Sequence, residues 1–270
     1  MNIIEQLKSN LFLNEYPKDF KLENVDFKYP HTNLRKEIIE AIFKNIKSDF
    51  YLEIGSMHGA SAILVAEYIK EKNLKTKIVC IDPFCGDINM WLWEKEKKIN
   101  NEWSFLNLKN GRPQIYETFL SNIKFTNNEN IILPIFCTSL IGTDLIRKLY
   151  SNNKISFLPN IIYLDSAHIE GETLLEIKKC YDLLPPGGIL YGDDFNWDSI
   201  QKDLKRFISY ISINTKLCYT IKESLKEESF ILDNKILIYR PKDQPHIPNS
   251  PERAKMWDPD PRNAFWMLCK

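Results

Sequence analysis

Short apolar runs rich in β-branched and aromatic residues alternate along most of the chain with longer segments whose apolar positions recur at helical spacing. This alternation is typical of a parallel β-sheet whose strands are joined by crossover helices. We expect strands at residues 50–55, 77–82, 130–136, 160–165 and 188–193. We expect helices at residues 59–73, 112–123, 138–150, 172–184 and 199–211. Three further apolar runs, at residues 216–222, 228–233 and 235–240, are candidates for the antiparallel strands that close the sheet.

Together these elements predict an α/β fold of the Rossmann-like, doubly wound class. In such a fold helices cover both faces of a mostly parallel sheet, which we expect here to have seven strands. The domain should span residues 47–240, with a long insertion at 84–115 after the second strand. Residues 1–46 look like a helical N-terminal extension, and residues 241–270 like a Pro-rich, polar tail on the surface.

The composition argues against several classes of partner. Lysine plus arginine and aspartate plus glutamate both number 36, so the formal net charge is zero. A broad electrostatic grip on nucleic acid or on an acidic membrane is therefore not expected. No apolar run approaches the ~18 residues that a membrane span needs, and the N-terminus has no signal-peptide core. We expect a cytoplasmic protein without membrane contact, and the sequence leaves a homo-oligomer open.

The six cysteines are scattered along the chain and form no C-x-x-C pair. Most of them lie inside apolar stretches, so we expect buried free thiols in a reducing compartment. A zinc site is not expected from this spacing.

A glycine-rich turn, residues 53–61, leads from the first expected strand into its helix. Glycines in such a turn permit tight curvature and close approach of a ligand to the backbone. The pattern is E-x-G-S-x-x-G-x-S, and Ser56 already departs from the G-x-G-x-x-G of dinucleotide sites. The candidate cofactor-binding residues are Glu53, Gly55, Ser56, Gly59 and Ser61. A plain tight turn between strand and helix is the alternative.

Two other strand ends add candidates at the same edge of the sheet. Asp82 ends the second expected strand, where such folds place an acidic side chain that hydrogen-bonds both ribose hydroxyls of a nucleotide. An aspartate before Pro83 could instead initiate a turn. Thr138 and Ser139 follow the third strand, where adenine-contacting residues fall, although either could be a helix N-cap. His58 is expected to lie against the cofactor rather than to act in the chemistry.

Acidic residues also follow the fourth and fifth expected strands. Asp165 and His168 lie where the fourth strand ends, and Asp193 and Asp194 lie where the fifth ends. The carboxyl ends of neighbouring strands open into one crevice, so the three carboxylates should converge there. Like charges in a partly dry crevice are costly, and an all-oxygen set of ligands favours Mg²⁺, with Mn²⁺ or Ca²⁺ as alternatives. The competing interpretation is that Asp193 and Asp194 cap the helix that begins near Asp198.

At this point the motifs carry a family resemblance. E-x-G-S-x-x-G-x-S, I-D-P-F, D-S-A-H and G-D-D resemble motifs of class I S-adenosylmethionine-dependent methyltransferases. The sequence is similar in particular to the metal-dependent O-methyltransferases of macrolide and aminocoumarin deoxysugars, over roughly residues 50–210. The resemblance implies that Glu53 helps to hold the methionine part of S-adenosylmethionine and that Asp165 lies beside the cofactor as well as the metal. The resemblance also implies that Asp165, Asp193 and Asp194 bind Mg²⁺ and that His168 is the catalytic base.

The resemblance predicts O-methyl transfer to a hydroxyl of a small molecule or glycan, first of all a sugar. Because S-adenosylmethionine already carries an activated methyl group, the protein has to orient the acceptor and help to form an oxyanion-like nucleophile. A divalent ion lowers the pKa of an alcohol, and His168 could then take its proton. The alternatives are a metal-independent methyltransferase and a cofactor-binding scaffold without turnover. The missing G-x-G-x-x-G weakens a nucleotide-dependent oxidoreductase.

The insertion at 84–115 contains Trp91, Trp93 and Trp103. These tryptophans could form a lid or an acceptor wall that stacks on a sugar face, or they could simply bury a surface helix.

Overall fold

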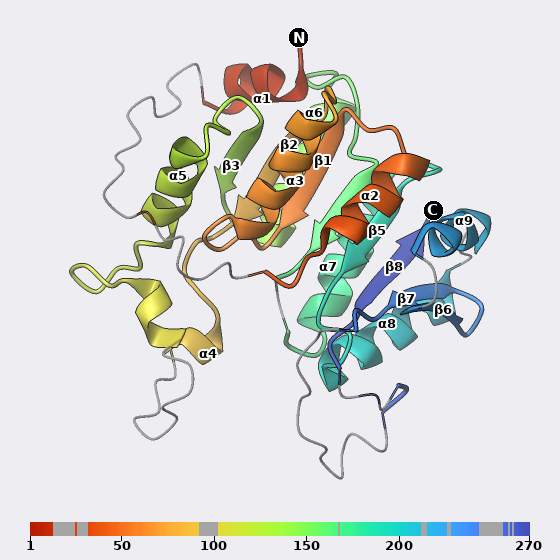
Figure 1. The fold of residues 1–270 in the computed structure, drawn as a ribbon. Helices are drawn as coiled ribbons and strands as arrows, with labels where there is room; N and C mark the ends of the chain where they lie inside the picture. Colours follow the sequence, from red (N-terminus) through yellow and green to blue (C-terminus); the bar gives the residue numbers. More distant parts are fainter. Residues whose placement is uncertain are drawn as a thin grey trace.

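Figure 1 shows the fold of the computed structural model, which describes residues 1–12, 25, 32–91, 102–166, 168–211, 215–225, 228–242, 256–258, 260 and 262–270. Its centre is an eight-stranded sheet with the order β3-β2-β1-β4-β5-β8-β7-β6. The strands are β1 (Phe50–Ile54), β2 (Lys77–Asp82), β3 (Ile132–Phe136), β4 (Ile161–Leu164), β5 (Ile189–Gly192), β6 (Ser229–Leu232), β7 (Ile236–Tyr239) and β8 (Phe265–Cys269). β1 to β5 are parallel, and β8, β7 and β6 continue the sheet with antiparallel pairing. The expected Rossmann-like, doubly wound α/β fold is confirmed, with eight strands in place of seven.

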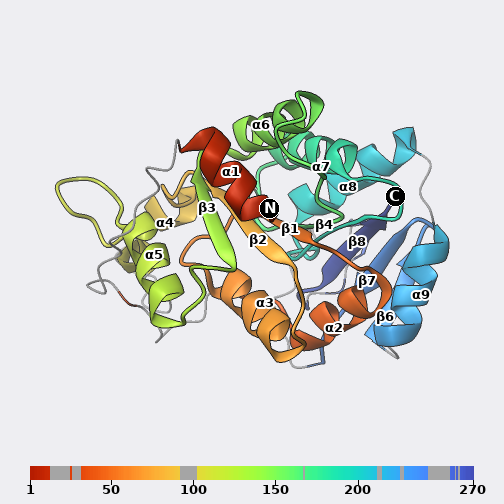
Figure 2. The same cartoon turned by 90° about the horizontal axis from the view of Figure 1, so that it is seen from above.

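Helices cover both faces of this sheet, as the view from above shows (Figure 2). The described helices are α1 (Ile3–Leu11), α2 (Lys36–Asn45), α3 (Ala60–Glu71), α4 (Ile88–Trp91), the 3₁₀ helix η1 (Glu102–Leu106), α5 (Ile115–Phe125), α6 (Ser139–Ser151), α7 (Glu172–Leu183), α8 (Asp198–Tyr210) and α9 (Thr215–Leu225). Along β1, Phe50 and Leu52 pack with α1, α6, α7 and α8, whereas Tyr51 packs with α2, α3, α5 and α9. This is the two-residue period of a strand that is buried on both faces.

The antiparallel end of the sheet differs from the sequence prediction. Residues 216–222, predicted as a strand, lie in α9, where Cys218, Ile221 and Leu225 are buried at the spacing of a helix. The strand beside β5 is instead β8, which comes from the segment that was expected to be a surface tail. All five residues of β8 are buried, because the strand lies inside the sheet between β5 and β7. The end of the chain is therefore part of the core.

The N-terminal extension also contributes to the core. Both described helices of the N-terminal extension, α1 and α2, pack on opposite faces of the sheet.

The prediction of free cysteines is wrong for two of the six, because Cys218 of α9 and Cys269 of β8 form a disulfide with their Cα atoms 5.9 Å apart. No helix in the described parts of the chain is long and apolar enough to cross a membrane.

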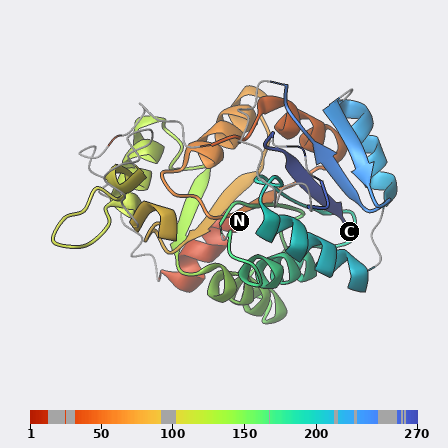
Figure 3. The ribbon, with the colours of Figure 1, turned by 90° about the horizontal axis from the view of Figure 1, so that it is seen from below.

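The register of the sheet aligns the carboxyl ends of four parallel strands. Ile54 at the end of β1 pairs with Ile81 of β2 and with Leu164 of β4, and Leu164 pairs with Gly192 of β5. From β1 the sheet continues to β2 and β3 on one side and to β4 and β5 on the other. The border between β1 and β4 is therefore the topological switch point, where such sheets bind ligands. Figure 3, seen from below, looks toward this edge.

Candidate active site

The glycine-rich turn after β1 lies directly against the loop after β4. Gly55 has a φ of +81°, and a Cβ atom on it would lie 1.9 Å from the backbone oxygen of Asp165. Gly59 precedes α3 with a φ of +86°, and a Cβ atom there would lie 2.9 Å from the ring of Phe119. Both positions therefore require glycine, for the backbone conformation and for the close approach.

Asp82, at the end of β2, holds this turn with its carboxylate. Its Oδ2 accepts hydrogen bonds from the backbone NH groups of Ser56 at 2.7 Å and Met57 at 2.9 Å. Its Oδ1 accepts a further bond from the backbone NH of Phe84. Burial raises the pKa of Asp82, and the three NH donors counteract that rise. Asp82 thus initiates a local turn, as the alternative interpretation had it, and also fixes the glycine turn of the neighbouring strand.

Glu53 is buried in β1 beneath the same turn. Its Oε1 accepts a hydrogen bond from the hydroxyl of Ser61 at 2.9 Å, whereas its Oε2 has no partner. Burial raises the pKa of Glu53 to about 8, although neighbouring serine hydroxyls counteract this in part. Glu53 is therefore mainly neutral near pH 7 in this structure, and one of its oxygens remains available to a ligand.

The other predicted cofactor residues have structural roles around this turn. His58 is buried, and its Nε2 lies 3.0 Å from the backbone oxygen of Phe105, which ties the glycine turn to η1 of the insertion. Thr138 is the N-cap of α6 and accepts a bond from the backbone NH of Ile141 at 3.4 Å. Ser139 is the first residue of α6. The N-cap interpretation therefore holds for Thr138, and adenine contact by either residue stays a prediction.

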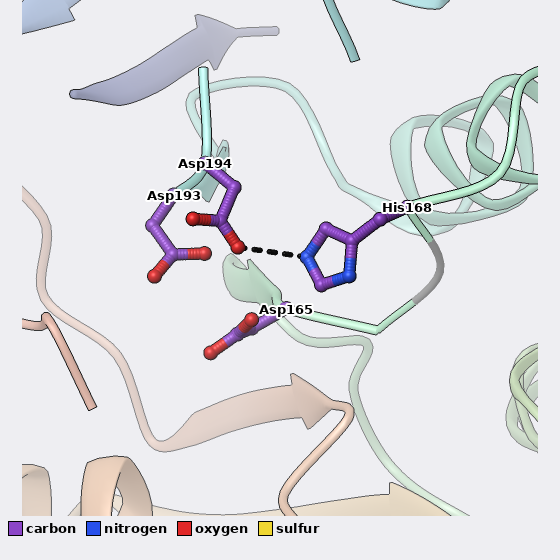
Figure 4. A group of neighbouring side chains, drawn as sticks. All are labelled: Asp165, His168, Asp193 and Asp194. Atoms are coloured by element: carbon purple, nitrogen blue, oxygen red, sulfur yellow. Dashed lines mark ion pairs between the residues drawn. The ribbon is translucent and has the colours of Figure 1, made fainter. Parts of the chain in front are cut away.

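The three predicted metal ligands and the predicted base come together in one cluster (Figure 4). Asp165, His168, Asp193 and Asp194 each offer a ligand atom, and these atoms all lie within 4.8 Å of one another. Asp165 and His168 come from the loop after β4, and the other two from the turn after β5, which pairs with β4. The Nε2 atom of His168 lies 2.8 Å from Oδ2 of Asp194.

Two carboxyl groups of this cluster, those of Asp165 and Asp193, have raised pKa values. Burial and then the charge of Asp194 raise the pKa of Asp165 to about 6. Burial and then the charges of Asp165 and Asp194 raise the pKa of Asp193 well above its usual range. The charge of Asp165 thus acts on the buried carboxyl of Asp193 and favours its neutral form. Asp193 is only 4% exposed, and its Oδ1 has no partner.

His168 is charged in this arrangement. Burial disfavours the charged imidazole, but the ion pair with Asp194 and the charges of Asp165 and Asp87 outweigh it and raise the pKa of His168 to about 9. A general base must be unprotonated, so the ion pair with Asp194 opposes that role. Asp87 precedes α4, so its influence shows that this part of the 84–115 insertion lies near the cluster.

The structure contradicts the interpretation in which Asp193 and Asp194 cap the next helix. α8 begins at Asp198, its N-cap is Trp197, and it has no side-chain cap. The ring of Trp197 instead stacks on His168, with the ring centroids 5.0 Å apart. Trp197 was not predicted as a site residue, although it lies three residues after the acidic pair Asp193 and Asp194 in the sequence.

The tryptophans of the insertion are only partly described. Trp91 lies on α4, is exposed, and donates its ring NH to the backbone oxygen of Cys85 at 2.8 Å. Trp93 lies outside the described residues, and of Trp103 only the backbone, in η1, is described. Whether these residues form a lid stays a prediction.

Among solved structures, the chain is similar to an O-methyltransferase from Bacillus cereus in complex with SAH, with 13% identity and a TM-score of 0.49, covering 100% of this chain and 98% of that one. It is similar to the O-methyltransferase TomG from Streptomyces achromogenes in complex with SAM, with 11% identity, a TM-score of 0.48 and coverage of 100% and 96%. It is also similar to an rRNA methylase from Streptococcus thermophilus, with 12% identity, a TM-score of 0.44 and coverage of 91% and 99%. These values are too low to transfer an acceptor or the role of a residue to this chain.

A family comparison is more decisive. No curated protein matches the chain. A family model described as "Methyltransferase domain" matches residues 52–195, which is more than half of the chain. The matched residues run from β1 to the turn after β5 and include the glycine turn, Asp82 and the whole acidic cluster. The chain therefore belongs to the methyltransferase domain family, and the predicted enzyme class, a methyltransferase, is confirmed at that level.

Proposed function

We propose that this methyltransferase transfers the methyl group of S-adenosylmethionine to a hydroxyl oxygen, with a divalent cation held by Asp165, Asp193 and Asp194. The observation that carries the proposal is the cluster itself, in which the ligand atoms of three carboxylates and His168 lie within 4.8 Å of one another. The cluster lies at the loop after β4, which contacts the glycine turn through Gly55. Donor and acceptor sites would then share the switch point of the sheet.

The proposed donor site is the glycine turn. The Oε2 atom of Glu53 has no partner, and a cationic ammonium of the methionine part would favour the ionised form of this carboxyl. Asp82 already accepts three hydrogen bonds, and a carboxylate offers about four acceptor sites, so Oδ1 can accept from a ribose hydroxyl. Ser56, Gly59 and Ser61 shape this site by holding the turn, and Thr138 and Ser139 are the proposed neighbours of the adenine.

The residues of the cluster fit a divalent cation. The oxygen atom of Asp193 without a partner is buried, and burial together with the charges of Asp165 and Asp194 raises the pKa of this carboxyl. A cation is the usual remedy for such a group of charges, and hard oxygen ligands favour Mg²⁺ over zinc or copper. Bound there, it would lower the pKa of an acceptor hydroxyl and, by offsetting the charge of Asp194, the pKa of His168.

The chain's own residues would supply the remaining chemistry. Asp165, Asp193 and Asp194 orient the acceptor hydroxyl toward the donor, and positioning of this kind accounts for much of the rate of a displacement reaction. His168 takes the hydroxyl proton at a ring nitrogen as the oxygen attacks the methyl group. The methyl group forms a bond to oxygen as its bond to sulfur breaks, and the sulfur keeps the electron pair of that bond. The products are a methyl ether, a protonated His168 and S-adenosylhomocysteine.

The acceptor that we propose is a sugar with two adjacent hydroxyls, free or as part of a glycan. Adjacent hydroxyls suit chelation, and the resemblance of the sequence to deoxysugar methyltransferases favours the same class. The even balance of 36 basic and 36 acidic residues gives no broad attraction to nucleic acid.

Methyl transfer can be measured as S-adenosylhomocysteine formed with methyl α-L-rhamnopyranoside as acceptor, with Mg²⁺ and with excess EDTA. We expect turnover with Mg²⁺ and none with EDTA. In parallel, S-adenosylmethionine should raise the melting temperature and NAD should not, because a ligand that binds only the folded state stabilises it. Stabilisation by NAD alone would contradict the donor, and full activity in EDTA would contradict the metal.

A second candidate is a metal-independent O-methyltransferase. The observation that favours it is the internal balance of the cluster, in which His168 pairs with Asp194 and the raised pKa of Asp193 favours its neutral form. In that case the four side chains would orient the acceptor through hydrogen bonds alone, and activity would survive EDTA.

A further inference from the structure

Trp197 occupies a position that helix stability does not explain. It is the N-cap of α8, and it forms no side-chain cap. Serine, threonine, aspartate and asparagine are preferred at this position because their side chains accept a hydrogen bond from the first turn of the helix. A tryptophan gives up that bond and leaves 38% of its surface exposed.

The Trp197 ring is held against the proposed catalytic machinery. It stacks on the imidazole of His168 with an interplanar angle of 29° and 5.0 Å between ring centroids. Its backbone NH donates to the backbone oxygen of Asp194 at 2.9 Å. His168, the other member of the stack, is also held in place, because the hydroxyl of Ser199 donates to its backbone oxygen at 2.6 Å. The exposed part of this ring therefore has a defined place beside the cluster.

Two residues next to the stacked pair in the sequence are unusual for a surface turn. Asn196, directly before Trp197, is only 3% exposed, and neither atom of its amide has a partner. Buried amides without partners are rare, and a ligand or water is needed to satisfy them. Ile169, directly after His168, is 53% exposed. Apolar walls with a few polar groups are typical of pockets for small molecules.

We propose that Trp197 is the stacking wall of the acceptor subsite and takes the apolar face of an uncharged ring that carries the reacting hydroxyl. The inference rests on the proposed function and adds the shape and charge of the acceptor. A ring face covers an indole well, whereas an open-chain diol does not. The cluster contains the carboxylates of Asp165, Asp193 and Asp194, and the charge of Asp87 also acts on His168. This negative charge would repel a phosphate or carboxylate on the acceptor.

The test compares Trp197→Ala, Trp197→Phe and the control Tyr219→Ala, which removes an aromatic ring on α9 that is 46% exposed. Saturation-transfer NMR with methyl α-L-rhamnopyranoside, in the presence of S-adenosylhomocysteine and Mg²⁺, reports which protons of the probe touch the protein. We expect saturation of the ring C–H protons with the wild type, Trp197→Phe and Tyr219→Ala, and its loss with Trp197→Ala. Propane-1,2-diol, which has hydroxyls but no ring, should give no signal that depends on Trp197.

Kinetics separate stacking from an effect through His168. For the rhamnoside, Trp197→Ala should raise KM roughly 3- to 10-fold, with a smaller effect on kcat, and Trp197→Phe should restore most of the loss. A fall in kcat with KM unchanged would show that Trp197 only positions His168 and would overturn the inference. So would ring saturation that persists in Trp197→Ala, or none in the wild type. Ring saturation without any metal-dependent methyl transfer would instead contradict the proposed function.

Discussion

Two groups of carboxylates lie at the same edge of the sheet, and the fold treats them differently. At the β1–β2 side, Asp82 accepts hydrogen bonds from three backbone NH groups. At the β4–β5 side, burial and neighbouring charges raise the pKa values of Asp165 and Asp193, and one oxygen of Asp193 has no partner. Backbone donors are part of the fold and are present without any ligand. Asp82 is therefore part of a preformed scaffold, whereas the cluster after β4 and β5 becomes balanced without protons only when a cation is bound.

The largest effect should come from the second group. Asp193→Asn and Asp194→Asn each remove a charged oxygen ligand and should abolish metal-dependent methyl transfer, because the cation loses its site. Affinity for S-adenosylmethionine should stay nearly intact, since Glu53 and Asp82 are unchanged. Activity assays with Mg²⁺ and calorimetric titration with S-adenosylmethionine check the two parts. Substantial Mg²⁺-dependent turnover in either variant would contradict the assignment.

His168→Ala should slow methyl transfer by roughly 10²–10⁴-fold if the imidazole is the base. Cofactor affinity should not change, because His168 lies in the loop after β4 and not in the glycine turn. Single-turnover rates with saturating donor and Mg²⁺ measure the chemical step. A rate within twofold of the wild type would remove His168 from the chemistry.

Asp82→Asn and Asp193→Asn are a matched pair that should affect the stability of the metal-free protein differently. Asp82→Asn weakens three buried backbone hydrogen bonds and should cost about 1–3 kcal/mol of unfolding free energy. Asp193→Asn removes repulsion between carboxylates and should be neutral or stabilising. Urea unfolding in EDTA compares them, and equal destabilisation by both would erase the distinction between scaffold and site.

Asp82 should also matter for the donor. Loss of its charge-assisted bond to ribose should weaken S-adenosylmethionine binding in Asp82→Ala, on the order of 1.5–3 kcal/mol.

A further effect concerns Glu53 and the pH dependence of stability. Its pKa is about 8 in the folded protein and about 4.3 in an unfolded chain. Between these values the folded protein binds a proton that the unfolded chain has lost, so stability contributed by Glu53 falls as pH rises from about 4.3 to 8. Glu53→Gln should remove this slope, which is at most about 1.4 kcal/mol per pH unit. Unfolding curves at pH 5, 6, 7 and 8 measure it, and unchanged slopes would contradict the buried neutral carboxyl.

Hydrophobic patterning predicted the parallel half of the sheet well. All five parallel strands appear within two residues of their predicted bounds, because buried strands form short apolar runs between clear turns. The antiparallel half was harder, since residues 216–222 mix apolar and polar positions in a way that suits either a strand or a helix. β8 was missed because a Pro-rich segment separates it from the rest of the domain, and five apolar residues at a chain end carry no period.

For the candidate site, the sequence predicted which residues would meet but not how they balance one another. Strand ends placed Asp165, His168, Asp193 and Asp194 at one edge, and the register brings their ligand atoms within 4.8 Å. The ion pair of His168 with Asp194, the three NH donors of Asp82 and the stacked Trp197 depend on side-chain contacts between distant segments, which no local pattern reveals.

Calorimetric titration of the protein with Mn²⁺, without cofactor, tests the account of the cluster most directly. Because the pKa of Asp165 is about 6 and that of Asp193 is raised well above its usual range, cation binding must displace protons. We predict one site per chain, affinity that rises with pH between about 5 and 7, and proton release seen as a dependence of the heat on the buffer. Asp193→Asn should lose this binding, whereas Asp82→Asn should keep it. No binding at millimolar Mn²⁺, or wild-type binding by Asp193→Asn, would contradict the assignment of Asp165, Asp193 and Asp194 as a metal site.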